Sequence, residues 1–146
     1  MNKKNNKGFS LIEIVVVLGI FILILAVGLV VNLSFFKSDI FSAERRTIVS
    51  SLEKARSRAM TNMYQTPHGF CYIEPNYVIF RGDTCAPAST NEIIGANAEI
   101  AEHASTILPT VVFSQLTGTT TDVTIHITNG IREADIIINK HGTINW

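Results

Sequence analysis

The residues most able to do chemistry are two cysteines and four histidines. Cys71 and Cys85 form an even pair, which favours a disulfide if both residues reach an oxidising compartment. Their bridge would close a loop of about 15 residues and add up to about 3 kcal/mol of stability in the chain-entropy model. The alternative is a pair of free, buried thiols.

The histidines are widely separated along the chain, and no H-x-x-x-H or C-x-x-C spacing indicates a metal site. They are His68, His103, His126 and His141. No nucleophile turn or phosphate-binding glycine loop is recognisable either. We therefore expect no catalytic residue, no metal and no cofactor, with a membrane-anchored enzyme as the weaker alternative.

Composition and charge give the first indication of how the chain that carries these residues is organised. The chain has 146 residues, a formal net charge of zero and 16% charged residues, whereas soluble domains have about 25%. Its length suggests one compact domain with an appendage, and its neutrality argues against a generally basic nucleic-acid binder. Because 23 of the first 36 residues are hydrophobic, the apolar excess lies at the N-terminus.

The N-terminal segment has the pattern of a membrane anchor. A short leader carries Lys3, Lys4 and Lys7, and residues 14–36 contain no charge. As a helix, those residues would be about 34 Å long, enough to cross the hydrocarbon core. The lysines predict a cytoplasmic N-terminus and an external C-terminal part. A cleaved secretory signal is the alternative, but the apolar run continues well past the small residues at 26–28.

Glu13 stands at the start of this apolar segment. A carboxylate deep in a membrane costs about 2.5–3.5 kcal/mol when it is unpaired, so it should have a partner. The simpler interpretation places Glu13 among the lipid headgroups, where it would cost little.

Residues 7–13, KGFSLIE, follow the basic leader and precede about 20 apolar residues. This junction resembles the class III signal of type IV prepilins and pseudopilins. The resemblance implies that a prepilin peptidase cuts after Gly8 and N-methylates Phe9, which makes Glu13 the fifth residue of the mature chain. In a helical stack, Glu13 could then pair with the Phe9 amine of a neighbouring subunit, which would favour assembly and fix the register.

After residue 37 the helical pattern becomes amphipathic, and it should end near residue 65, before the breaker sequence at 66–69. Its apolar face is expected to pack under a head domain and contains Phe41, Ile48, Leu52, Ala55, Ala59 and Met63. Basic residues scattered around this helix are interpreted as a solvated face that pairs with neighbouring subunits, rather than as a nucleic-acid-binding stripe.

Residues 66–146 have a β pattern. We expect a hairpin of strands 69–73 and 77–81, then strands at 98–101, 110–116, 122–128, 136–138 and 143–145. The expected fold class is α+β and type IV pilin-like, with a long N-terminal hydrophobic helix packed on a C-terminal antiparallel β domain. The predicted divisions are a leader at 1–8, a transmembrane and filament-core helix at 9–36, its amphipathic continuation at 37–65 and a periplasmic head at 66–146.

The head resembles the H-type minor pseudopilins, the GspH/FimT family. The resemblance rests on residues 52–59 at the helix end, Phe113, Gly118, strand 123–127 and the 136–144 segment. It implies a minor pseudopilin or pilin subunit of a type II secretion or type IV pilus machine that supports protein secretion. The implied location is the bacterial inner membrane, single-pass, with a periplasmic head. The implied partners are other pseudopilins or pilins and the prepilin peptidase.

Two other functions remain open. Some members of this family bind DNA in natural transformation and carry an arginine in a C-terminal motif, whereas this chain has no arginine after Arg132. Loss of residues 1–8 would also remove three lysines and no acid, leaving nine basic and 12 acidic residues. The missing arginine counts against nucleic acid as a partner, because phosphate contacts need clustered Lys and Arg. A major pilin is the other alternative.

Overall fold

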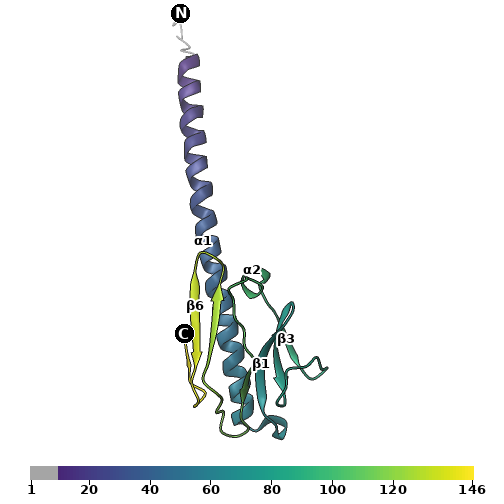
Figure 1. The fold of residues 1–146 in the computed structure, drawn as a ribbon. Helices are drawn as coiled ribbons and strands as arrows, with labels where there is room; N and C mark the ends of the chain where they lie inside the picture. Colours follow the sequence, from purple (N-terminus) through teal and green to yellow (C-terminus); the bar gives the residue numbers. More distant parts are fainter. Residues whose placement is uncertain (1–9) are drawn as a thin grey trace, which may run out of the picture. The chain divides into compact units, whose positions relative to one another are not determined.

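The computed structural model describes residues 10–146, with side chains for 10–27 and 38–146. The chain divides into two compact units, Met1–Ser38 and Asp39–Trp146. One α-helix, α1 (Leu11–Met60), contributes residues to both. Figure 1 shows the helix and the strands that follow it.

Within the second unit, α1 has the amphipathic pattern that the sequence predicts. Phe41, Ile48, Leu52 and two alanines of the predicted face are buried. Met63 is an exception, with 38% of its surface exposed, because the α-helix stops at Met60. A short 3₁₀ helix, η1 (Met63–Gln65), follows instead of the α-helical continuation that we expected.

A four-stranded antiparallel sheet forms one part of the head. It contains β1 (His68–Ile73), β2 (Asn76–Arg81), β3 (Glu92–Gly95) and β4 (Val111–Phe113), in the order β3-β2-β1-β4. The predicted hairpin is confirmed, since β1 and β2 pair in register from His68 opposite Arg81 to Ile73 opposite Asn76. Strand β4 is shorter than predicted because Leu116 and Gly118, both at positive φ, turn the chain soon after Phe113.

The strand predicted at 98–101 is wrong. These residues form a short helix, α2 (Ala98–Ala101), because the Asn97 side chain accepts a hydrogen bond from the Glu99 amide at 3.0 Å and caps its start. The strand in this region lies earlier, at β3, where Glu92–Gly95 pairs with β2.

A second, three-stranded antiparallel sheet contains β5 (Val123–Thr128), β6 (Glu133–Ile138) and β7 (Ile144–Asn145), in that order. The predicted alternation of β5 is confirmed at Ile125 and Ile127, which are fully buried. Ile136 and Ile138 of β6 share that buried face. Both sheets and residues 39–60 of α1 contribute to one apolar core, which confirms an α+β fold with an N-terminal helix and antiparallel sheets.

Candidate functional site

The start of α1 places the predicted assembly residue in a helical first turn. The Ser10 carbonyl accepts hydrogen bonds from the amides of Glu13 at 3.0 Å and Ile14 at 3.3 Å. A carboxylate in a first turn interacts favourably with the positive end of the helix dipole. Within the described part of the chain, the exposed Glu13 side chain has no ion pair, so its charge is available to a group outside that part.

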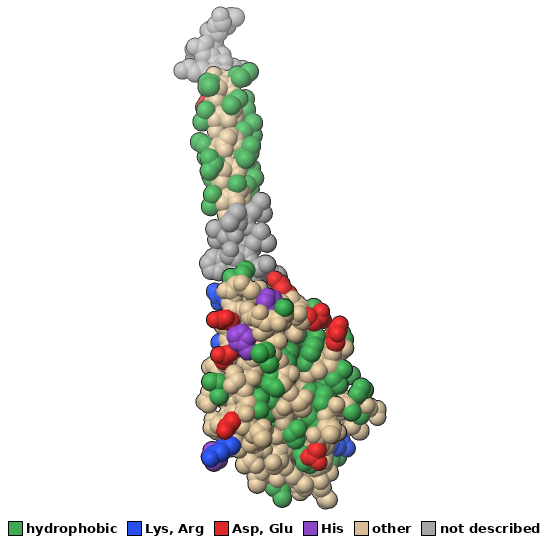
Figure 2. Space-filling view, viewed as in Figure 1, with side chains coloured by type: hydrophobic (Ala, Val, Ile, Leu, Met, Phe, Trp, Pro, Cys, Tyr) green, Lys and Arg blue, Asp and Glu red, His purple; other side chains and the backbone are tan. Residues whose placement is uncertain are grey.

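The described part of the first unit is mostly apolar, apart from Ser10 and Glu13 near its start. Every side chain from residue 10 to residue 27 is exposed, including Leu11 at 81%, Ile12 at 68% and Leu23 at 66%. Hydrophobic side chains cover this stretch of helix in Figure 2. A helix that is hydrophobic all round is normally covered by other protein or by lipid. This surface therefore needs a cover that the described residues do not provide.

Within residues 10–27 and 38–146, no helix combines the length and the apolar character that crossing a membrane requires. The predicted transmembrane segment 9–36 extends beyond these residues, because residue 9 and the side chains of 28–36 lie outside the described part. Gly8 and Phe9, the predicted sites of cleavage and N-methylation, also lie outside the described residues. Both processing steps stay predictions.

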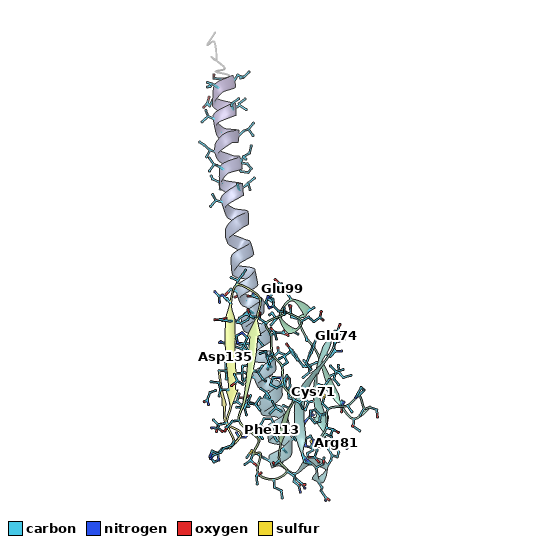
Figure 3. All side chains as sticks on the ribbon, viewed as in Figure 1. Cys71, Glu74, Arg81, Glu99, Phe113 and Asp135 are labelled. Carbon is cyan, nitrogen blue, oxygen red and sulfur yellow. A yellow bond between two sulfur atoms is a disulfide. The ribbon has the colours of Figure 1, made fainter. Side chains whose placement is uncertain are left out.

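The cysteines meet on the outer face of the four-stranded sheet. Cys71 of β1 and Cys85, which follows β2, are joined by a disulfide, with their Cα atoms 6.3 Å apart. Cys71, Val78 and Phe80 are buried in a small cluster separate from the main core. The disulfide thus holds the segment after β2 over this face, and Cys71 is labelled in Figure 3.

Two of the basic residues on α1 are used within the head. Lys54 Nζ lies 2.5 Å from Glu92 Oε1 of β3, and Arg58 donates to Glu92 Oε2. The hydrogen bond from Lys54, assisted by Arg58, lowers the pKa of Glu92, although partial burial opposes this. Where we had expected these cations to pair with neighbouring subunits, Lys54 and Arg58 tie α1 to the edge strand of the sheet.

A second contact between α1 and the sheets, which we call the latch, is formed by Arg56, Gly118, His141 and Gly142. These residues belong to the segments on which the family resemblance rests. The Arg56 Nη2 donates to the His141 carbonyl at 3.2 Å. Gly118 and Gly142, both at positive φ, lie against this side chain, and a Cβ on Gly142 would be 2.1 Å from the Gly118 carbonyl oxygen. The end of α1 and the turns before β5 and β7 therefore meet at a place where only glycine fits.

One buried carboxylate was not found by sequence reasoning. Glu44 of α1 is only 8% exposed and accepts a hydrogen bond at 2.8 Å from the Asn97 amide, at the start of α2. Burial, together with the nearby Glu44 carboxylate, raises the pKa of the Tyr77 phenol. The regular helical pattern around Glu44 gave no signal of this contact, because its partner is a backbone group 53 residues away.

The histidines lie in separate places. His126 of β5 pairs with Asp135 of β6 at 2.6 Å, whereas His68 is buried and its Nδ1 lies 3.1 Å from the Thr66 carbonyl oxygen. Among the described residues, no group of three or more His, Cys, Asp or Glu side chains is arranged to hold a metal ion.

Comparison with known families gives one match. Residues 3–29 match the model of the prokaryotic N-terminal methylation motif. No curated protein and no solved structure matches the chain. The motif is that of type IV pilin- and pseudopilin-like proteins, and it covers the segment that contains Gly8, Phe9 and Glu13.

Proposed function

We propose that this type IV pilin- or pseudopilin-type protein is a minor subunit of a type II secretion or type IV pilus machine. It would enter a periplasmic filament through its N-terminal helix and so support protein secretion. The observation that carries the proposal is the methylation motif at residues 3–29, which overlaps a helix whose side chains are exposed and mostly apolar from residue 10 to residue 27.

Processing would prepare this helix for assembly. Cleavage after Gly8 by a prepilin peptidase removes the three leader lysines and creates an α-amino group on Phe9, four residues from Glu13. A buried charge without a partner is costly, so Glu13 would drive one subunit to align with the Phe9 amine of the next. Apolar side chains such as Leu11 and Ile12 would then be covered by neighbouring stems in the filament.

Before assembly, residues 9–36 would anchor the chain in the bacterial inner membrane. The leader lysines favour a cytoplasmic N-terminus, which places the head in the periplasm. The Cys71–Cys85 disulfide supports this location, because disulfides persist in oxidising compartments and are rare in the cytosol.

Assignment to the H-type branch has support in the head. Arg56, Gly118 and Gly142 are far apart in the sequence, and all three belong to the segments that resemble the GspH/FimT family. They meet in one latch, so a single set of contacts between α1 and the two turns accounts for all three residue types. We propose the H-type minor subunit on this basis.

The proposal can be tested with Glu13→Ala in a host that carries the assembly machine. The variant should be cleaved to the mature length in the membrane but should be depleted from sheared filaments. Glu53→Ala is a matched control, because Glu53 is an exposed acid on the head part of α1 and should leave incorporation unchanged. Normal incorporation of Glu13→Ala would refute the assembly role.

A further inference from the structure

A cavity of about 220 Å³ lies at the C-terminal end of α1, where the helix meets one end of the four-stranded sheet. Its walls come from α1, η1 and the first three strands. The residues that matter for its chemistry are Arg58, Tyr64, His68, Arg81, Asn91 and Glu92. Arg81 is labelled in Figure 3 at this end of the sheet.

The charge in and around this cavity is positive. Lys54 and Arg58 share the single carboxylate of Glu92. Arg81 forms no ion pair with any residue that the structure describes. Of the charged residues that line the cavity, Arg58 and Arg81 are cations and Glu92 is the one anion, and Glu92 is already paired with Arg58 and with Lys54 outside the lining.

Arg81 is also held in place. Its guanidinium carbon lies 3.4 Å from the centre of the Tyr64 ring, which covers one face of the group. An arginine stacked on an aromatic ring keeps its N–H edge free to donate, and that planar edge matches the oxygens of carboxylate and phosphate groups.

The backbone beneath this stack has an unusual conformation. Asn62, Tyr64 and Gln65 all have positive φ values, between 55° and 60°, which are uncommon for residues other than glycine. Gln115 Nε2 donates to Asn62 Oδ1 at 2.5 Å and secures the segment. Such conformations persist where the surroundings enforce them, and they concentrate at ligand-binding sites. Here they present the Tyr64 ring to Arg81.

A buried histidine completes the wall. His68 is only 2% exposed, and its Nδ1 lies 3.1 Å from the Thr66 carbonyl oxygen. Burial lowers the pKa of His68 against the opposing effect of the Thr66 hydrogen bond, and the positive charges of Arg58 and Arg81 lower it further. The His68 ring is therefore close enough to both arginines to report on a change of charge beside them.

We propose that this cavity binds one oxyanion, a carboxylate or phosphate group, with the Arg81 guanidinium as its principal donor. The group can come from an acidic side chain of a neighbouring subunit or from a free anion in the surroundings. The site lies in the head, so phosphate binding tests it independently of assembly, and only the neighbouring subunit as a source of the group rests on the proposed function.

The test uses the full chain in detergent micelles, with histidines labelled for NMR and inorganic phosphate as the probe. The His68 resonance is assigned with a His68→Gln variant, and chloride keeps the ionic strength constant. Phosphate should shift this resonance saturably and raise the pKa of His68, because an anion offsets the positive charges of Arg58 and Arg81 that lower it. Acetate should compete for the same site.

Arg81→Gln should weaken phosphate binding about tenfold, equivalent to about 1.4 kcal/mol, as expected for loss of a charge-assisted donor. Arg81→Lys keeps the charge but loses the planar edge, so its affinity for phosphate should lie between those of the wild type and Arg81→Gln. Arg132→Gln is the matched control, because Arg132 is an exposed arginine outside the cavity and its loss should change nothing. Circular dichroism checks that each variant is folded.

Absence of a saturable shift, or equal binding by wild type and Arg81→Gln, would overturn the proposal. The source of the anion is decided by a second measurement on a folded Arg81→Gln variant that has lost phosphate binding. Reduced incorporation of this variant into filaments would identify a carboxylate from a neighbouring subunit. Unchanged incorporation would identify a free anion.

Discussion

The two units of this chain differ in whether their apolar side chains are exposed or buried. The described side chains of Met1–Ser38 are exposed from residue 10 to residue 27, whereas Asp39–Trp146 buries Ile48, Leu52 and Phe113 completely. The head finds its partners within its own sequence, and the N-terminal helix must find them elsewhere. One α-helix thus takes part in a self-contained domain and also carries an apolar surface suited to association.

The largest expected effect comes from a matched pair of leucines on that helix. Leu52→Ala removes a fully buried side chain and should destabilise the head by about 2–5 kcal/mol. Leu18→Ala changes a side chain that is 55% exposed and should leave head unfolding within about 0.5 kcal/mol of wild type. Urea unfolding, followed by fluorescence of the single tryptophan, Trp146, measures both. Equal losses of unfolding free energy in the two variants would contradict the difference between the buried and the exposed part of the helix.

Reduction of the disulfide should have the next largest effect. Cys71 and Cys85 are 14 residues apart, and loss of a bridge across such a loop costs about 3 kcal/mol in the chain-entropy model. Thermal unfolding with and without dithiothreitol should show a large difference for wild type. The melting temperature of the Cys71→Ser, Cys85→Ser double variant should not change with the reductant. If the melting temperature of the wild type does not change either, the bridge does not stabilise the head.

The latch between the end of α1 and the two sheet turns should be sensitive to a single methyl group. Gly142→Ala places a Cβ at positive φ and 2.1 Å from the Gly118 carbonyl oxygen, which should cost at least about 1 kcal/mol. Gly95→Ala is the control, because its Cβ would meet nothing within 4 Å and its φ is not positive. The difference between the two melting temperatures measures the latch, and equal values would argue against it.

The smallest effect concerns the ion pairs of Glu92. Lys54 and Arg58 lower the pKa of this carboxylate below its ordinary value of 4.5, so they stabilise the head above that pH. The stabilisation should fade as the pH drops through the lowered pKa. Because these groups are partly exposed, we expect about 1 kcal/mol or less, and Glu92→Gln should lose this part of the acid sensitivity. An unchanged pH profile in the variant would exclude the contribution.

The sequence predicted most reliably where the pattern was periodic. The buried face of α1 in the head, the β1–β2 hairpin and the alternation of β5 all repeat apolar residues at fixed intervals, and the structure confirms them. The segment 82–109 lacked such a pattern. There, a side-chain cap on Asn97 decided between helix and strand, and the edge strand β3 was missed.

The polar contacts were less accessible to prediction because they join distant parts of the chain. Glu44 accepts a hydrogen bond from the Asn97 amide, and Glu92 forms ion pairs with Lys54 and Arg58 of α1. Nothing local distinguishes these carboxylates from solvated ones. The N-terminal junction is the reverse case, because its prediction depends on a compact local motif and needs no tertiary contact.

The central claim is that the exposed N-terminal helix belongs to a processed assembly segment, and mass spectrometry of the mature N-terminus tests it most directly. The protein would be purified from membranes of a host with an active prepilin peptidase and from a matched strain without the peptidase. The account predicts a chain that begins at Phe9 with one added methyl group, only when the peptidase is present. A chain that still begins at Met1, or one cut near residue 28, would contradict it.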